Sequence, residues 1–104
     1  MARRDNPKLE KMIEEVSVDC DTEDDVAMGL CYAMQEHLKF PFTGTLVGEE
    51  VVVEGVEEGE GSEIVGLCRR RGRTYRVRLD DITIQRRPKG AEWIDAYFQF
   101  RGKR

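Results

Sequence analysis

The hydrophobic pattern of the chain changes its period close to residue 43, and this change limits the folds that the chain can adopt. Before it, apolar residues recur three and four positions apart, which is typical of α-helices. One helix is predicted after Asn6 and Pro7, and a second, largely buried helix from about Thr22 to Pro41. After it, apolar and polar residues alternate, which is typical of β-strands. Helices followed by a run of strands predict an α+β domain.

Five short strands are expected in the second part of the chain. Their ranges are 43–47, 51–56, 63–69, 73–79 and 82–85. Because the strands are short, with glycine-containing turns between them, we expect a small antiparallel sheet bent like an SH3-like barrel. In the fourth strand, Tyr75 is expected to point toward the core together with Val77 and Leu79.

A third helix is expected at the C-terminal end of the chain. It follows Pro88 and Gly90. Its apolar stripe consists of Trp93, Ile94, Tyr97 and Phe98. Such a stripe predicts a helix that packs on the sheet.

The length of 104 residues fits one domain, in which the helical part (1–42), the β part (43–87) and the C-terminal helix (88–104) belong together. Charge is distributed unevenly over it. Residues 1–66 hold 17 acidic and 5 basic residues, a net charge of −12, and residues 67–104 hold 4 acidic and 12 basic residues, a net charge of +8. The folded molecule is therefore expected to have an acidic and a basic side.

The cysteines indicate a reducing environment. Cys20, Cys31 and Cys68 are odd in number and form no C-x-x-C pair, so we expect free thiols and a cytoplasmic location. Their spacing, also with His37, matches no zinc-site pattern. No apolar run has the length of a membrane span, and the first residues lack the apolar stretch of a signal peptide.

An enzyme is not expected. The sole histidine, His37, is predicted at the end of the second helix, where the helix dipole favours it. Neither Ser17 nor Ser62 lies in a nucleophile motif, and the glycines form no phosphate-binding loop.

Carboxylates are crowded where the second helix begins. Two like charges about 4 Å apart repel by roughly 1 kcal/mol in water, so five carboxylates within residues 19–25 need compensation. A bound cation, the helix N-terminus with its cap, or arginines could supply it. Calcium takes about six to eight oxygen ligands. Asp19, Asp21, Glu23 and Asp24 are therefore candidate calcium ligands, although the other positions of an EF-hand loop are absent.

A calcium site in this place would need further ligands from a second segment. One candidate is the loop with Glu57, Glu58 and Glu60, which could also form a weaker site of its own or be merely a solvated loop. The other candidate is the pair Asp80 and Asp81. Magnesium is the less suitable ion because it keeps more of its waters.

A longer stretch resembles a known family. Residues 21–43 start with the acidic run, continue through a helix with Ala27-Met28-Gly29, and end in Phe40-Pro41-Phe42-Thr43. This order is similar to that of the CcbP-type bacterial calcium-binding proteins. The likeness covers most of residues 9–100 and includes the Gly48-Glu49-Glu50-Val51 turn, the Arg70-Arg71-Gly72 hairpin and the aromatic C-terminal helix. The resemblance implies a small protein without EF-hands that buffers or senses Ca²⁺.

The basic half of the chain suggests an alternative function. Arg69, Arg70, Arg71 and Arg73 are expected on one β-hairpin, which could bind nucleic acid or a protein partner. Nucleic acid is the less favoured partner because no aromatic residue is expected to be exposed beside these arginines. Alternatively, the arginines neutralise the acidic half within the molecule. We expect a monomer without membrane contacts.

Overall fold

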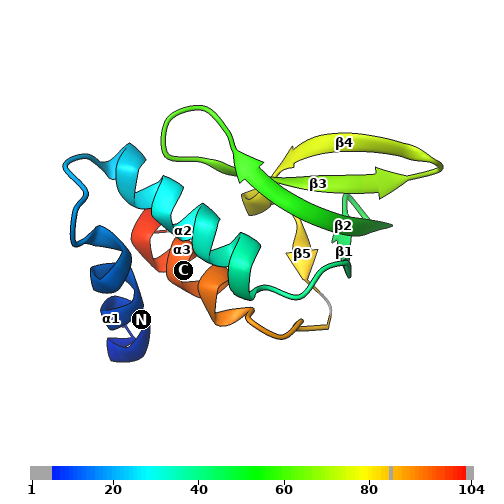
Figure 1. Ribbon diagram of the computed structural model, residues 1–104. Coiled ribbons are helices and arrows are strands. Elements are labelled where there is room, and N and C mark those ends of the chain that lie inside the picture. Colours follow the sequence, from blue (N-terminus) through cyan, green and yellow to red (C-terminus); the bar gives the residue numbers. More distant parts are fainter. Residues whose placement is uncertain (1–5, 85, 103–104) are drawn as a thin grey trace.

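The computed structural model describes residues 6–84 and 86–102 and confirms the α+β class (Figure 1). In this part of the chain, three α-helices lie together at one end of the molecule, and a five-stranded antiparallel sheet extends from them. A short 3₁₀-helix, η1, connects the last two strands. In chain order the elements are α1 (Pro7–Ser17), α2 (Glu23–His37), β1 (Phe42–Leu46), β2 (Glu49–Glu58), β3 (Ile64–Arg70), β4 (Arg73–Arg78), η1 (Leu79–Asp81), β5 (Thr83–Ile84) and α3 (Glu92–Arg101).

The first two helices begin at the caps that the sequence predicts. The Asn6 side chain accepts a hydrogen bond from the amide of Lys8 (2.9 Å), and Thr22 Oγ1 accepts one from the amide of Asp25 (3.1 Å). These amides lie in the first turn, where no carbonyl of the helix is available to them. The cap of α2 therefore fixes the place at which the acidic run turns into a helix.

The strands pair in the order β4-β3-β2-β1-β5. Their predicted limits agree with the observed ones to within one residue, except that β2 begins two residues earlier and ends two residues later than predicted. Gln85, the predicted end of the fifth strand, lies outside the described residues. That the sheet is an SH3-like unit stays a prediction.

Two tight turns at one end of the sheet contain a strained residue. Val47 in the β1–β2 turn has a φ of 50°, and Arg71 in the β3–β4 turn has a φ of 54°; each is followed by a glycine with positive φ. Two-residue hairpin turns of this kind usually place asparagine, aspartate or glycine at the first position. Any other residue in this conformation costs roughly 1–2 kcal/mol.

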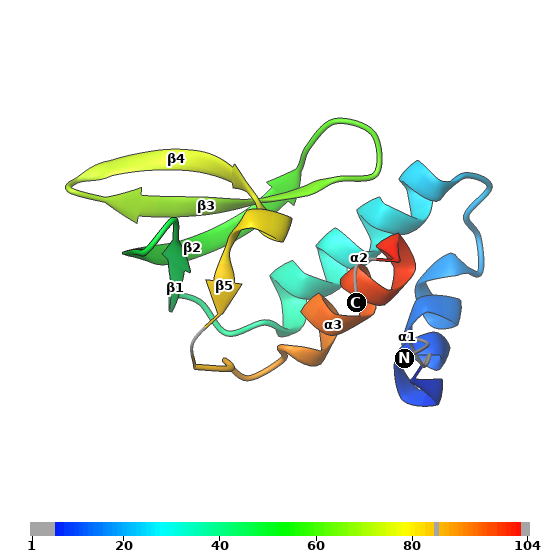
Figure 2. The same cartoon turned by 180° about the vertical axis from the view of Figure 1, so that it is seen from behind.

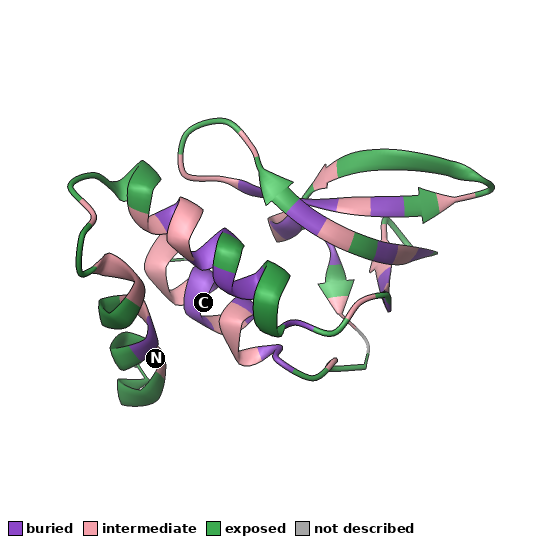
Figure 3. Ribbon diagram, viewed as in Figure 1, coloured by how far each residue is buried: buried purple, intermediate pink, exposed green. Residues whose placement is uncertain are grey.

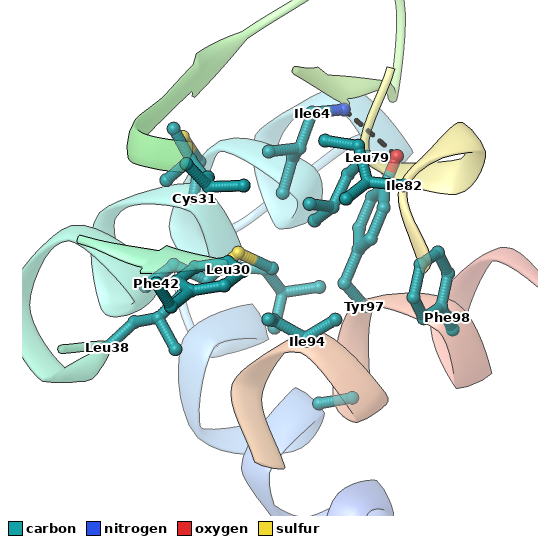
Figure 4. Close-up of a cluster of buried hydrophobic side chains, with 14 of the residues drawn as sticks. Leu30, Cys31, Leu38, Phe42, Ile64, Leu79, Ile82, Ile94, Tyr97 and Phe98 are labelled. Carbon is teal, nitrogen blue, oxygen red and sulfur yellow. Dashed lines mark hydrogen bonds between the residues drawn. The ribbon is translucent and has the colours of Figure 1, made fainter. Parts of the chain in front are cut away.

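The core lies between α2, α3 and one face of the sheet (Figures 3 and 4). Leu30 of α2 and Val53 of β2 are fully buried, and Ile94 and Tyr97 of α3 pack into the same cluster. The hydroxyl of Tyr97 accepts a hydrogen bond from the amide of Ile64, at 2.9 Å, where β3 begins (Figure 4). This bond joins the helical end of the molecule to the sheet.

The C-terminal helix has other neighbours than expected. α3 lies beside α1 and α2, and Figure 2 shows it between them. The ring of Trp93 stacks on that of His37 of α2, with 5.7 Å between the ring centres. α2 itself lies on β2 and β3. Ile94, Tyr97 and Phe98 of the stripe reach the core cluster, which contains residues of both helices and strands. Packing on the sheet, as predicted, is observed at Tyr97 through its bond to β3.

One predicted side-chain orientation is wrong. Tyr75 of β4 was expected in the core, but its exposed fraction is 43%. The first four residues of β4 are exposed, whereas Leu79 at the far end is fully buried. The outer half of the β3–β4 hairpin thus extends beyond the core, and strand periodicity does not reveal where cover by the helices ends.

Candidate metal centre

The acidic run is exposed, and no arginine of the described residues forms an ion pair with it. Asp19 and Asp21 lie between α1 and α2, and Glu23 and Asp24 lie in the first turn of α2. Among the ion pairs of residues 6–84 and 86–102, none involves these four carboxylates. Within this part of the chain, the compensating charge is therefore the N-terminal end of α2 or a bound cation.

One contact connects the acidic run to the β2–β3 loop. The Ser62 hydroxyl donates a hydrogen bond to Asp24 Oδ1, at 2.9 Å. The loop is itself closed, because the Gly59 amide bonds to the Glu63 carbonyl (2.9 Å) and the Glu63 amide to the Glu60 carbonyl (3.1 Å). In Figure 1 this loop arches beside the start of α2. Of the two segments that could complete a site at the acidic run, the fold brings this one to it.

The other candidate segment is engaged elsewhere. Asp80 lies on η1, and one oxygen of its largely buried carboxylate is 3.2 Å from the Arg78 guanidinium and 3.9 Å from that of Arg101. A carboxylate between two guanidinium groups is already compensated. We therefore do not place Asp80 in a site with the acidic run.

The loop that was predicted to hold a second site is partly neutralised by an arginine. Arg76 of β4 pairs with Glu57 (3.0 Å) and also donates a hydrogen bond to the backbone carbonyl of Glu58 (2.9 Å). Arg76 also lines an open pocket of about 430 Å³ beside the loop. The other residues that line it are Glu58, Gly59, Glu60, Glu63 and Val65. In the described chain the carboxylates of Glu58 and Glu60 have no ion pair, whereas Glu63 pairs with Arg78 at 2.6 Å.

The seven predicted ligands do not converge on one point. Among the described residues, no group of three or more histidine, cysteine, aspartate or glutamate side chains is placed to hold a metal ion. The donors nevertheless suit calcium, because all of them are oxygens on exposed side chains or in a loop, and calcium accepts an irregular oxygen shell. A site at this place would require the two segments to turn their carboxylates toward each other.

The thiols are unsuited to bind a metal. Cys20, Cys31 and Cys68 are free cysteines. Burial raises the pKa of Cys31 to about 11, with a smaller contribution from Glu58 and Glu57, and burial also raises the pKa of Cys68. Zinc binds the thiolate. Raised pKa values keep these thiols protonated near neutral pH and work against such a site.

Two of the four arginines of the basic hairpin are neutralised by glutamates of the acidic half of the chain. Arg69 pairs with Glu54 (3.3 Å) and Arg70 with Glu49 (2.8 Å). The guanidinium of Arg70 also lies over the ring of Tyr75, 5.9 Å from its centre. The expectation that no exposed aromatic accompanies these arginines was therefore wrong. Arg71 and Arg73 complete the predicted set, and Arg71 occupies the strained turn.

Two residues of this region were not predicted to take part in the metal site. Ser62 carries the contact to Asp24, and Arg76 occupies two oxygen groups of the acidic loop. The contacts of both residues depend on how segments that are distant in the sequence come together. A hydroxyl between glycine and glutamate in an acidic loop was the one visible signal for Ser62, and the sequence offered none for Arg76.

Comparisons with known proteins agree with one another. A family model with the description calcium binding, Calci_bind_CcbP, matches residues 10–98. The fold is similar to the crystal structure of Anabaena CcbP, with a TM-score of 0.78 and 22% identity over 99% of this chain and 95% of that chain. It is also similar to a calcium binding protein in the calcium-binding form, with a TM-score of 0.71 and 25% identity over 100% and 99% of the two chains. No curated protein matches the sequence.

Proposed function

The chain belongs to the CcbP family of calcium-binding proteins, and from this premise we propose that it binds Ca²⁺ where the start of α2 meets the β2–β3 loop. The acidic run supplies Asp19, Asp21, Glu23 and Asp24, and the loop supplies its carboxylates and carbonyls. The observation that carries the proposal is the hydrogen bond between Ser62 and Asp24, because it holds the two segments together. The two predicted sites are then two halves of one site.

The charges of the two segments favour a divalent cation. Like charges at each segment repel, and bringing the segments closer increases the repulsion unless a cation lies between them. A bound Ca²⁺ supplies that positive charge. The loop side contributes Glu58 and Glu60 directly, and Glu57 once it leaves Arg76. Calcium takes about six to eight oxygen ligands, and the two segments together offer that many oxygens.

Buffering or sensing of calcium follows from an open site. The candidate ligands are exposed and must be ordered when the ion binds, which costs conformational entropy and keeps binding reversible. We propose that the protein acts in this way, without catalysis, as a bacterial cytoplasmic monomer of one domain, residues 1–104, with an SH3-like β part. The free cysteines support a cytoplasmic location, because disulfide bonds are rare there. In the described residues, no helix has both the length and the apolar character that crossing a membrane requires.

Calorimetric titration with calcium and with magnesium tests the proposal. The variants are Asp24→Asn, Glu60→Gln and their combination, and Asp81→Asn is the control, an exposed carboxylate on η1. We expect calcium to bind more tightly than magnesium, and each single variant to weaken calcium binding. The double variant should lose less binding free energy than the two single variants together, because Asp24 and Glu60 belong to one site.

Other results would contradict it. Additive losses from Asp24→Asn and Glu60→Gln would indicate two separate sites. Loss of binding in Asp81→Asn alone would place the site at η1. A wild-type protein whose unfolding temperature and titration heat do not respond to calcium would exclude the function as a whole, since a ligand at about 100 times its Kd stabilises a fold by about 2.7 kcal/mol.

A further inference from the structure

The two hairpin turns lie at the same end of the sheet, and an ion pair connects the strands beside them. The β1–β2 turn contains Val47 and the β3–β4 turn contains Arg71. Glu49, which follows the first turn, pairs with Arg70, which precedes the second, at 2.8 Å. Figure 1 shows both turns at the end of the sheet that points away from the helices. They lie opposite the region in which we place calcium.

The turns require the backbone conformation, but no contact among the described residues explains why valine and arginine occupy these strained positions. Asparagine or glycine would adopt the backbone conformation of Val47 and Arg71 with little strain. The Val47 side chain is 94% exposed, and that of Arg71 is exposed as well. Neither gains from packing what its backbone loses. Strained residues that the fold does not require often mark functional positions, and here both present their side chains to the outside.

The residues around the two turns share a chemistry. Arg70 of β3 lies directly opposite Arg73 of β4 in the strand register, and Tyr75 lies two residues further along β4. The three side chains are therefore on one face of the sheet. Arg71 and Arg73 have no ion pair among the residues that the structure describes, unlike Arg69, Arg70, Arg76 and Arg78. We call the set Val47, Arg70, Arg71, Arg73 and Tyr75 the tip surface.

We propose that the tip surface binds an acidic segment of a partner protein. Carboxylates of the partner pair with Arg71 and Arg73, and separate apolar side chains of the partner pack against Val47 and against the exposed part of Tyr75. Tyrosine and arginine are the residue types, with tryptophan, that dominate binding at protein interfaces. Positive charge that the acidic half leaves uncompensated lies at this end of the sheet and complements such a partner.

Nucleic acid fits this surface less well. Two unpaired arginines offer few of the phosphate contacts on which nucleic-acid binding depends. An exposed valine in a strained turn adds nothing to phosphate binding. It does add apolar contact area for a protein partner.

Asparagine substitutions separate binding from folding. Val47→Asn and Arg71→Asn each remove a side chain of the tip surface and relieve the strain of its turn. We expect each to raise the unfolding temperature by several degrees and to weaken binding of a fluorescent peptide in which glutamates alternate with leucine and phenylalanine, by about tenfold. Lys89→Asn is the matched control, because Lys89 is an exposed cation between β5 and α3; it should change neither quantity.

The measurement is fluorescence anisotropy at low salt, with and without calcium, since the proposal does not depend on the calcium site. Three further probes define its limits: a peptide with alanine in place of leucine and phenylalanine, an oligothymidine, and a labelled sample of the protein itself in place of the peptide. Tighter binding of the oligothymidine would overturn the proposal in favour of nucleic acid. Binding of the labelled protein to the unlabelled protein that is lost in Arg71→Asn would assign the surface to a second copy of the chain. No binding of the mixed peptide, or equal loss in Lys89→Asn, would overturn the proposal outright.

Discussion

The Ser62 hydroxyl donates a hydrogen bond to the Asp24 carboxylate over a distance of 2.9 Å, although 38 positions of sequence separate the two residues. This bond is the direct link between the acidic run at the start of α2 and the acidic β2–β3 loop. Among the described residues, neither segment places three or more carboxylates where they could hold a metal ion. In the site that we propose, the bond identifies the β2–β3 loop as the second segment.

Replacing Ser62 by alanine should weaken calcium binding several-fold. The loop would no longer be held beside Asp24, and ordering it would then cost conformational entropy when the ion binds. An exposed hydrogen bond of this kind contributes at most about 1 kcal/mol to folding, so the unfolding temperature without calcium should hardly change. Titration calorimetry measures the affinity, with Ser62→Thr as the control that keeps the hydroxyl. Equal affinity of Ser62→Ala and wild type would mean that the loop takes no part.

Removing the positive charge of Arg76 should strengthen calcium binding. Arg76 holds Glu57 and the Glu58 carbonyl, two oxygen groups that calcium could use. Arg76→Gln frees the carboxylate of Glu57 and removes a competing cation from the pocket. Arg73→Gln loses the same charge on the same strand, away from the loop, and serves as the control. A larger gain in calcium affinity for Arg76→Gln than for Arg73→Gln supports the loop as part of the site; the same gain in both would reflect net charge alone.

The Tyr97 hydroxyl should contribute to stability. Tyr97→Phe leaves the amide of Ile64 without its partner in a buried place, which costs about 1–3 kcal/mol. Each 1 kcal/mol lowers the unfolding temperature by several degrees in a domain of this size. Tyr32 is 55% exposed and provides the control Tyr32→Phe, which should unfold as the wild type does. A Tyr97→Phe protein as stable as Tyr32→Phe would show that the bond does not stabilise the fold.

Alkaline pH should destabilise the protein through Cys31. Burial raises the pKa of this thiol from 9.0 in the unfolded chain to about 11 in the folded one. The folded state therefore favours the neutral thiol, and the associated stability is complete below pH 9 and is lost as the pH rises toward about 11. The full effect is roughly 2–3 kcal/mol for two pKa units.

Denaturant unfolding across this pH range measures the effect. Cys31→Ala should start from a lower free energy of unfolding, because it leaves a small cavity, but should lose less of it between pH 9 and 11. Parallel losses in Cys31→Ala and the wild type would assign the alkaline transition to other groups.

Local features of the fold could be predicted from the sequence. Asn6 and Thr22 cap their helices through groups two or three residues away, so a short stretch of sequence contains both partners. The helix from Thr22, the five strands and the C-terminal helix follow from period and turn residues in the same way. The family resemblance, carried by residues 21–43, also pointed to calcium.

Contacts between distant segments could not be predicted. The ion pair of Arg76 with Glu57 depends on the register of β2, β3 and β4, and one shifted residue would separate the two. Tyr75 was placed in the core because alternation indicates a face but not how far the helices cover it. The hydrogen bond between Ser62 and Asp24 depends on where α2 lies relative to the sheet. Such long-range geometry decides which of the predicted carboxylates can share an ion.

An NMR titration of the backbone amides with calcium tests the location of the site most directly. If calcium lies between the start of α2 and the β2–β3 loop, the amides of residues 19–25 and 57–63 shift together with one midpoint, and those around Asp80 and Asp81 stay in place. Shifts that follow two different midpoints, that occur in only one of the two segments, or that centre on Asp80 and Asp81 would contradict the account.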